Sequence, residues 1–178
     1  GHLSKILVAV GQKLKAGECQ VMAYPDPGDV AEIENSPALE LLKQEGLNVG
    51  YLAMNTSRKP FDDVRVRRAV NMSIDKATIV DAVYQGAGAP AKNPIPPTLW
   101  SYNDAIQDYP YDPAQARKLL DEAGLAQGFD TELWYMPVSR PYYPNAKRVA
   151  ELIQTDLAKI GIRVHLITDE WSRYRARL

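Results

Sequence analysis

The chain has 178 residues, of which 46% are hydrophobic and 24% are charged, a composition typical of a globular protein with an apolar core. Its formal net charge of −1 excludes the strongly basic surface that binding to nucleic acid or to an acidic membrane would require. The longest apolar run, residues 6–10, is far shorter than the roughly 20 residues that cross a bilayer.

The first elements in chain order are short. We expect a helix over residues 3–16, a strand over Cys19–Met22 and a turn over the proline-containing segment 24–28. Asp29 and Glu32 have the spacing of a capping box, which predicts the start of another short helix.

A second group of predicted elements follows. A helical turn is expected from Pro37 to near Gly46. Side chains alternate along residues 47–56, which predicts a strand. Gly50 inside that strand indicates a bend or a close approach of another segment.

Three helices with aspartate caps are predicted in the middle of the chain. Asp63 and Asp75 precede the first two, and Gly86 ends the second. Asp112 precedes a third helix, which has Pro113 at its first position and is closed by Gly124. Six prolines between residues 87 and 113 indicate an extended surface loop before that helix. The inward-facing positions of the three helices are Val66, Ala69, Val70, Ser73, Ile79, Val80, Val83, Ala116, Leu119, Leu120 and Ala123.

The last part of the chain predicts a β-α-β unit. Strands are expected over Thr131–Met136 and Ile162–Ile167, with a helix over Ala146–Ile160 between them. Two strands joined in this way are parallel, and ligands of such units bind beyond the carboxyl ends of the strands. The loop from Pro137 to Pro144 is therefore the expected binding edge.

No residue pattern typical of an enzyme is present. His165 alternates with core positions on a predicted strand, so it should face away from the core, and it has neither a neighbouring nucleophile nor metal-ligand spacing. Cys19 is the single cysteine, which excludes an internal disulfide. We predict no catalytic residue, no metal site and no cofactor.

Arg140 is the most distinctive candidate for ligand binding. It lies between Pro137 and Pro141, at the carboxyl end of a predicted strand. A planar guanidinium held there suits a bidentate grip on a carboxylate, and the alternative is an ordinary surface arginine. Aromatic residues that offer rigid contact area to a ligand, or else pack in the core, are Trp100, Trp134, Tyr135, Tyr142, Tyr143 and Trp171.

Several long segments of the sequence form specific motifs. They are PFDDVRVRRAVNMSIDKATIVDAVYQGAGAPAKNPIPP from residue 60, YDPAQARKLLDEAG from residue 111 and MPVSRPYYPNAKR from residue 136. The first two resemble hallmark regions of the family 5 extracellular solute-binding proteins, which serve ABC importers, and the third is similar to the dipeptide-binding members. The resemblance covers residues 13–178.

The resemblance implies an α/β fold of the periplasmic-binding-protein type, a two-lobed type II clamshell of which this partial chain forms mainly one lobe. Residues 1–46 would be the tail of the first lobe and residues 47–178 an incomplete second, ligand-binding lobe, with a hinge near 46–51. It implies a periplasmic protein, not an enzyme, that captures dipeptides and delivers them to an inner-membrane ABC permease.

Single residues also acquire expected roles from the resemblance. Arg140 matches the arginine that pairs with the peptide carboxylate in the dipeptide binders. Met136, Tyr142 and Trp134 flank it and are further ligand-binding candidates. The family's dipeptide binders tie a cysteine at the position of Cys19 to an amino-terminal segment that this chain lacks, so Cys19 should be free.

Alternatives remain open at this point. A member of the same family could bind haem, a nickel chelate, a tripeptide or an oligopeptide, since Arg140 suits any anionic ligand. A peptide hydrolase is an alternative of another class. A helix beginning near Asp169 is cut at Leu178, which we interpret as truncation. We therefore expect the isolated chain to bind peptide weakly or not at all, and an unpaired sheet edge could cause it to dimerise.

Overall fold

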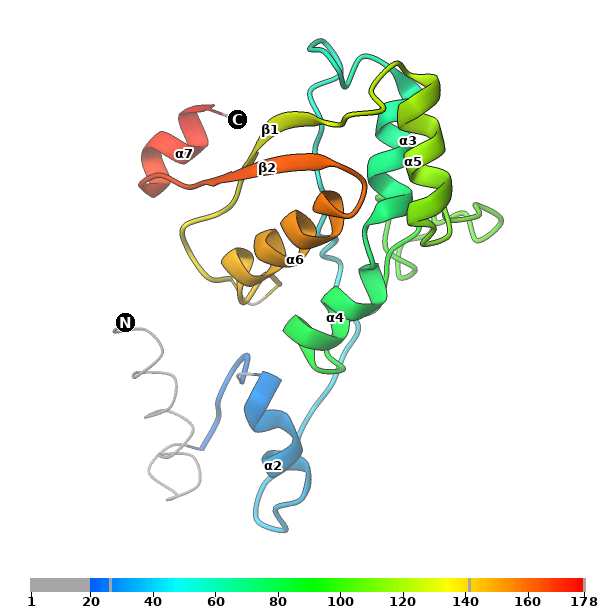
Figure 1. Ribbon diagram of the computed structural model, residues 1–178. Helices are drawn as coiled ribbons and strands as arrows, with labels where there is room; N and C mark the ends of the chain where they lie inside the picture. The colour runs from blue at the N-terminus through cyan, green and yellow to red at the C-terminus, as the bar shows by residue number, and fades with distance from the viewer. Residues whose placement is uncertain (1–19, 26, 141, 178) are drawn as a thin grey trace.

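The body of the molecule is built on a β-α-β unit. The computed structural model describes residues 20–25, 27–140 and 142–177. Strands β1 (Phe129–Trp134) and β2 (Ile162–Ile167) are parallel neighbours, and α6 (Ala146–Ala158) joins them (Figure 1). The predicted unit is confirmed, although β1 begins and ends two residues earlier than expected and α6 ends two residues earlier.

The two faces of this sheet differ in polarity. Ile162 and Val164 are buried on the face that packs against α6, while Arg163 and His165 alternate with them and are exposed. Arg163 lies opposite Asp130 in the strand register, and its Nη2 is 2.7 Å from the Asp130 Oδ2 atom. His165 is therefore on the solvent side, as its alternation with core positions predicts.

Three helices complete the body, and each begins as the sequence predicts. They are α3 (Val64–Ser73), α4 (Lys76–Tyr84) and α5 (Pro113–Glu122). A side-chain carboxylate caps each of them and accepts a hydrogen bond from a backbone N–H in the first turn, which satisfies a donor that the helix itself leaves free. The caps are Asp63 to the Arg65 N–H, Asp75 to the Thr78 N–H and Asp112 to the Gln115 N–H.

The apolar faces of these helices meet α6 and β2 in one core. Helix α3 packs along α5, and α6 contacts α3, α4 and β2. Val66, Ala69 and Ala116 are fully buried at the contact between α3 and α5. Gln85, the residue that follows α4, has a left-handed conformation, and Gly86 comes next with a φ of 91°. Residues 87–112 contain no helix or strand, which confirms the predicted loop.

Two glycines allow the β-α-β unit to close tightly. Gly128, just before β1, has a φ of 71°, and Gly161, just before β2, has a φ of 87°. A Cβ atom added at Gly128 would lie 1.8 Å from the carbonyl oxygen of Gly161. No side chain fits at that place without displacing the backbone.

Several predictions for the amino-terminal segment are wrong. Beyond one turn, in which the Leu39 N–H donates to the Ser36 carbonyl at 3.2 Å, residues 37–46 form no helix, and residues 47–56 form no strand. A strand needs a hydrogen-bonded partner, and none of the strands in the described ranges pairs with this segment. Leu52 and Met54 nevertheless alternate with exposed neighbours and pack against the core.

The earliest described residues also differ from expectation. Residues 20–22 are not a strand, and Cys19 and the helix predicted over 3–16 lie outside the described residues. The short helix α2 (Val30–Glu34) is confirmed, but Asp29 makes no side-chain cap because it already has helical angles in the preceding 3-10 turn, η1 (Pro27–Asp29). Large apolar side chains that remain exposed here are Val21, Tyr24, Leu42, Leu47 and Tyr51.

Candidate functional site

The loop between β1 and α6 lies at the carboxyl ends of both strands. The backbone N–H of Tyr135 donates to the Ile167 carbonyl at 3.0 Å, and the Thr168 hydroxyl donates to the Tyr135 carbonyl at 3.0 Å. These bonds tie the end of β1 to the end of β2. The loop therefore starts from a fixed base, at the edge where ligands of parallel α/β sheets bind.

Arg140 occupies the tip of this loop on a restrained backbone. Its N–H donates to the Tyr143 carbonyl at 3.2 Å, and its carbonyl accepts from the Tyr143 N–H at 2.9 Å. The Ser139 hydroxyl donates to the Pro144 carbonyl at 2.8 Å, which adds a further restraint between the two sides of the turn. Among the residues that the structure describes, no carboxylate forms an ion pair with the Arg140 guanidinium.

Helix α7 (Trp171–Arg177) packs beside the loop and supplies an aromatic surface for Arg140. The Arg140 Cζ atom lies 5.3 Å from the centre of the Trp171 ring. Trp171 in turn stacks on Tyr174 at 5.9 Å with an interplanar angle of 14°, and Tyr174 is buried. The guanidinium is thus placed over an aromatic pair whose inner member is fixed in the fold.

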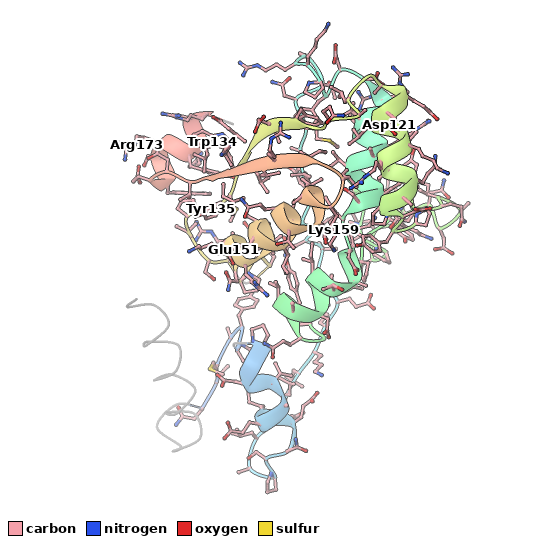
Figure 2. The ribbon with its side chains drawn as sticks, viewed as in Figure 1. Asp121, Trp134, Tyr135, Glu151, Lys159 and Arg173 are labelled. Carbon is pink, nitrogen blue, oxygen red and sulfur yellow. The ribbon has the colours of Figure 1, made fainter. Side chains whose placement is uncertain are left out.

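A second arginine–aromatic pair holds α7 to β1. The Arg177 Cζ atom lies 5.1 Å from the centre of the Trp134 ring, and the Trp134 indole N–H donates to Glu132 at 2.9 Å. Figure 2 shows Trp134 at the end of β1 beside α7, near Arg173. The two pairs are reciprocal, because α7 contributes the ring to one and the cation to the other.

Three tyrosines from different parts of the chain support the loop: Tyr84 of α4, Tyr143 of the loop itself and Tyr174 of α7. The Tyr84 hydroxyl, from α4, donates to the Tyr142 carbonyl at 3.2 Å. Burial, together with the neighbouring Tyr84 and Tyr174 hydroxyls, raises the pKa of Tyr143 to about 12. Burial also raises the pKa values of Tyr84 and Tyr174. These three groups therefore stay neutral at physiological pH and support the loop by packing.

The other predicted ligand-binding residues lie at the end of β1 or in the loop that follows it, in different settings. Met136 follows β1 and is half-buried, and Tyr142 is exposed next to the tip of the loop. Trp134 already uses its indole N–H on Glu132 and has Arg177 over its ring, so it has a structural contact to α7. A role in ligand binding remains a prediction for all three residues, as it does for Arg140.

Sequence reasoning gave Trp171 no role beside Arg140. Trp171 is separated from Arg140 by 31 positions, and only the folded chain brings the two together. The one available signal was that an aromatic residue just after β2 in a parallel unit lies at the same sheet edge as the loop after β1. That signal is weak, because it does not specify a contact with Arg140. Tyr174, three positions further along, shares a helix face with it.

No group of three or more His, Cys, Asp and Glu side chains in the described ranges has the arrangement of a metal site. None of the helices in these ranges is long and apolar enough to cross a membrane.

Comparison with known proteins gives a consistent result. A family model described as "Bacterial extracellular solute-binding proteins, family 5 Middle" matches residues 8–178. Heme-binding protein A of Haemophilus influenzae is 54% identical over 165 residues, which are 93% of this chain and 30% of that protein. The dipeptide-binding protein of Escherichia coli is also 54% identical over 165 residues, which cover 93% of this chain and 31% of that protein.

Solved structures share the fold. The structure of HbpA2 from Haemophilus parasuis superposes with a TM-score of 0.87 at 44% identity, over 96% of this chain and 34% of that chain. The dipeptide binding protein from Pseudoalteromonas sp. SM9913, in complex with Met-Leu, gives a TM-score of 0.80 at 40% identity, over 97% of this chain and 34% of that chain. The chain thus spans about a third of the length of its relatives. It has the α/β fold of type II periplasmic binding proteins and belongs to family 5 of the bacterial extracellular solute-binding proteins.

Proposed function

We propose that this chain is the ligand-binding part of a periplasmic solute-binding protein that captures dipeptides and delivers them to an inner-membrane ABC permease. In this proposal Arg140 pairs with the carboxylate of the bound peptide. Residues 47–178 form most of the second lobe, residues 1–46 end the first lobe, and the hinge lies near 46–51. No chemical change of the peptide is required, since capture depends on closing two lobes around it.

The setting of Arg140 is the observation that carries the proposal. Its backbone is fixed by the bridge to Tyr143, its guanidinium lies on Trp171, and no described carboxylate neutralises it. An arginine that is restrained and yet unpaired retains donors for an incoming anion, and its planar fork suits a carboxylate. A dipeptide carries such a carboxylate and must find a partner for it when water is displaced.

A thermal-shift titration of the full-length protein that carries this chain tests the proposal. Free dipeptides, C-terminally amidated dipeptides and N-acetylated dipeptides are compared in the wild type and in Arg140→Ala. A ligand at 100 times its dissociation constant stabilises the folded state by about 2.7 kcal/mol. We expect free dipeptides to raise the melting temperature of the wild type, and amidation or Arg140→Ala to abolish most of that response.

Arg148→Ala is the matched control for loss of a positive charge near the loop. Arg148 lies in the first turn of α6, and among the described residues it forms one ion pair, an exposed one with Glu151 at 3.7 Å. Exposed pairs of this kind contribute about 0–1 kcal/mol, so this variant should keep the dipeptide response. If Arg148→Ala and Arg140→Ala lose the response equally, general charge rather than a specific contact is responsible.

Haem is the second candidate ligand, because a haem-binding relative and a dipeptide-binding relative are each 54% identical to this chain. Haem also carries carboxylates that Arg140 could bind. A parallel titration with haem, followed by its absorbance spectrum, separates the two ligands. A haem response without a dipeptide response would overturn the proposed ligand, and recovery of intact dipeptide after long incubation would argue against a peptide hydrolase.

For the isolated 178 residues we propose weak or absent peptide binding. The large exposed apolar side chains between residues 21 and 51, and Trp100 at 96% exposure, are surfaces that a second lobe or a second copy of the chain could cover. Light scattering of the isolated chain tests for dimerisation. A dissociation constant for a dipeptide in the low micromolar range or below would contradict the need for a second lobe.

A further inference from the structure

We propose that Trp171 is a positioning residue for Arg140: its ring orients the guanidinium while leaving the N–H donors free for the ligand carboxylate. This inference rests on the proposed function, because it explains how the chain prepares Arg140 for an anion. It adds a residue from α7 to a site that otherwise belongs to the loop between β1 and α6.

The geometry supports positioning rather than neutralisation. The Arg140 Cζ atom lies over the Trp171 ring at 5.3 Å. An aromatic ring attracts a cation to its face through its quadrupole and accepts no conventional hydrogen bond from it. The five guanidinium N–H donors form a planar fork. A ring 5.3 Å from Cζ restricts the position of the group and leaves these donors for a carboxylate.

The two acidic residues just before Trp171 are both occupied elsewhere, since Glu170 accepts a hydrogen bond from the backbone N–H of Ser172 at 3.0 Å. Asp169, two residues before Trp171, pairs with Arg173 at 2.9 Å and with Arg177 at 3.9 Å. If Asp169 instead paired with Arg140, a ligand carboxylate would have to displace it. Arg173 and Arg177, two of the three arginines of α7, pair with this carboxylate, and the described group that lies against the Arg140 guanidinium is the Trp171 ring.

Trp171 is itself held firmly enough to orient its partner. Its ring stacks on Tyr174 with an interplanar angle of 14°, and Tyr174 is 7% exposed. Tyr174 lies close enough to Tyr143 to influence the pKa of Tyr143, and Tyr143 forms the backbone bridge to Arg140. The Trp171 ring is thus held by Tyr174 and the Arg140 backbone by Tyr143. Because Tyr174 and Tyr143 lie close together, the motion of Trp171 relative to Arg140 is limited.

A double-mutant cycle in the full-length protein tests the inference, with dissociation constants for a free dipeptide and for its C-terminal amide as readouts. The variants are Arg140→Ala, Trp171→Leu, the double variant and Trp171→Phe. We expect Trp171→Leu to weaken binding of the free dipeptide roughly 2- to 30-fold and to reduce the preference for free over amidated peptide. Trp171→Phe keeps an aromatic ring and should retain most of the affinity for the free dipeptide and most of its preference over the amide. In the Arg140→Ala background, Trp171→Leu should have no further effect.

Tyr102→Leu is the matched control, because Tyr102 is also a half-buried ring near a cation, with the Lys92 Nζ atom 5.8 Å from its centre. It should leave both dissociation constants unchanged. If Trp171→Leu does not yield folded protein, Trp171→Met provides the same loss of the ring with a more adaptable side chain.

The outcomes separate this inference from the proposed function. If Trp171→Leu weakens binding equally with and without Arg140, Trp171 acts directly or only structurally, and the inference is overturned while the role of Arg140 stands. If Arg140→Ala leaves the binding of free dipeptide unchanged, the proposed role of Arg140 fails and the inference fails with it.

Discussion

Replacing Gly128 by alanine should destabilise the β-α-β unit more than the same change at Gly161. Both glycines have positive φ angles, 71° and 87°, which cost an alanine about 1–2 kcal/mol. At Gly128 the new Cβ would also lie 1.8 Å from the Gly161 carbonyl oxygen, whereas at Gly161 the nearest contact is an ordinary 3.5 Å to the Gly128 Cα atom. Overpacking of this kind costs about 1–3 kcal/mol more.

The two strands begin at this place, so a backbone shift would act on their first pairing, between Phe129 and Ile162. Amide hydrogen exchange across β1 and β2 in the full-length protein measures the effect, because it reports the free energy of local opening. We expect exchange in Gly128→Ala to be about 5- to 150-fold faster than in Gly161→Ala, following the difference of about 1–3 kcal/mol. Equal exchange rates in the two variants would refute the steric reasoning.

Three further predictions concern charged and buried polar groups, each measured by thermal unfolding of the full-length protein. Hydrogen bonds from the Arg65 side chain and backbone N–H lower the pKa of Asp63 to about 2. The ionised carboxylate therefore stabilises the fold above pH about 4. The higher stability of the wild type over Asp63→Asn should be lost as the pH falls through about 2. A constant advantage would contradict this. The buried Asp156 carboxylate accepts from the Asp75 N–H at 2.9 Å and from Lys159 at 2.7 Å, so Asp156→Leu should cost about 1–3 kcal/mol and Asp156→Asn, which keeps an acceptor, should cost less. Burial raises the pKa of Tyr143 to about 12. The neutral hydroxyl therefore stabilises the fold fully below pH about 10, and this contribution is lost as the pH rises towards about 12. Tyr143→Phe should lose less stability than the wild type between pH about 10 and about 12.

The elements that the sequence predicted well are those specified by neighbouring residues. Asp63, Asp75 and Asp112 each accept a backbone N–H two or three positions ahead, so their helices begin where the sequence says. Gly161 and the apolar alternation of β2 likewise mark the start of the strand, although α6 ends two residues before the predicted Ile160. A resemblance to a known family added the fold class, which the comparisons then confirmed.

The errors have a common physical cause. Residues 47–56 alternate as a strand does, but a strand forms only where another segment supplies hydrogen bonds, and no described strand does so. The stretch after Pro37 has apolar residues without a surface to bury them, and Leu42 stays 85% exposed. Local pattern indicates a tendency in both cases, and the absence of a partner in the described residues decides the result.

For the candidate site, the sequence by itself determined the loop, its place after β1 and the arginine within it, because these follow from the order of strand, loop and helix along the chain. Only the tertiary structure decided what surrounds Arg140. Trp171 and Tyr174 come from α7, and Tyr84 from α4. Contacts between such distant segments depend on how the helices pack around the sheet, and that packing is set by the whole core rather than by any one stretch of residues.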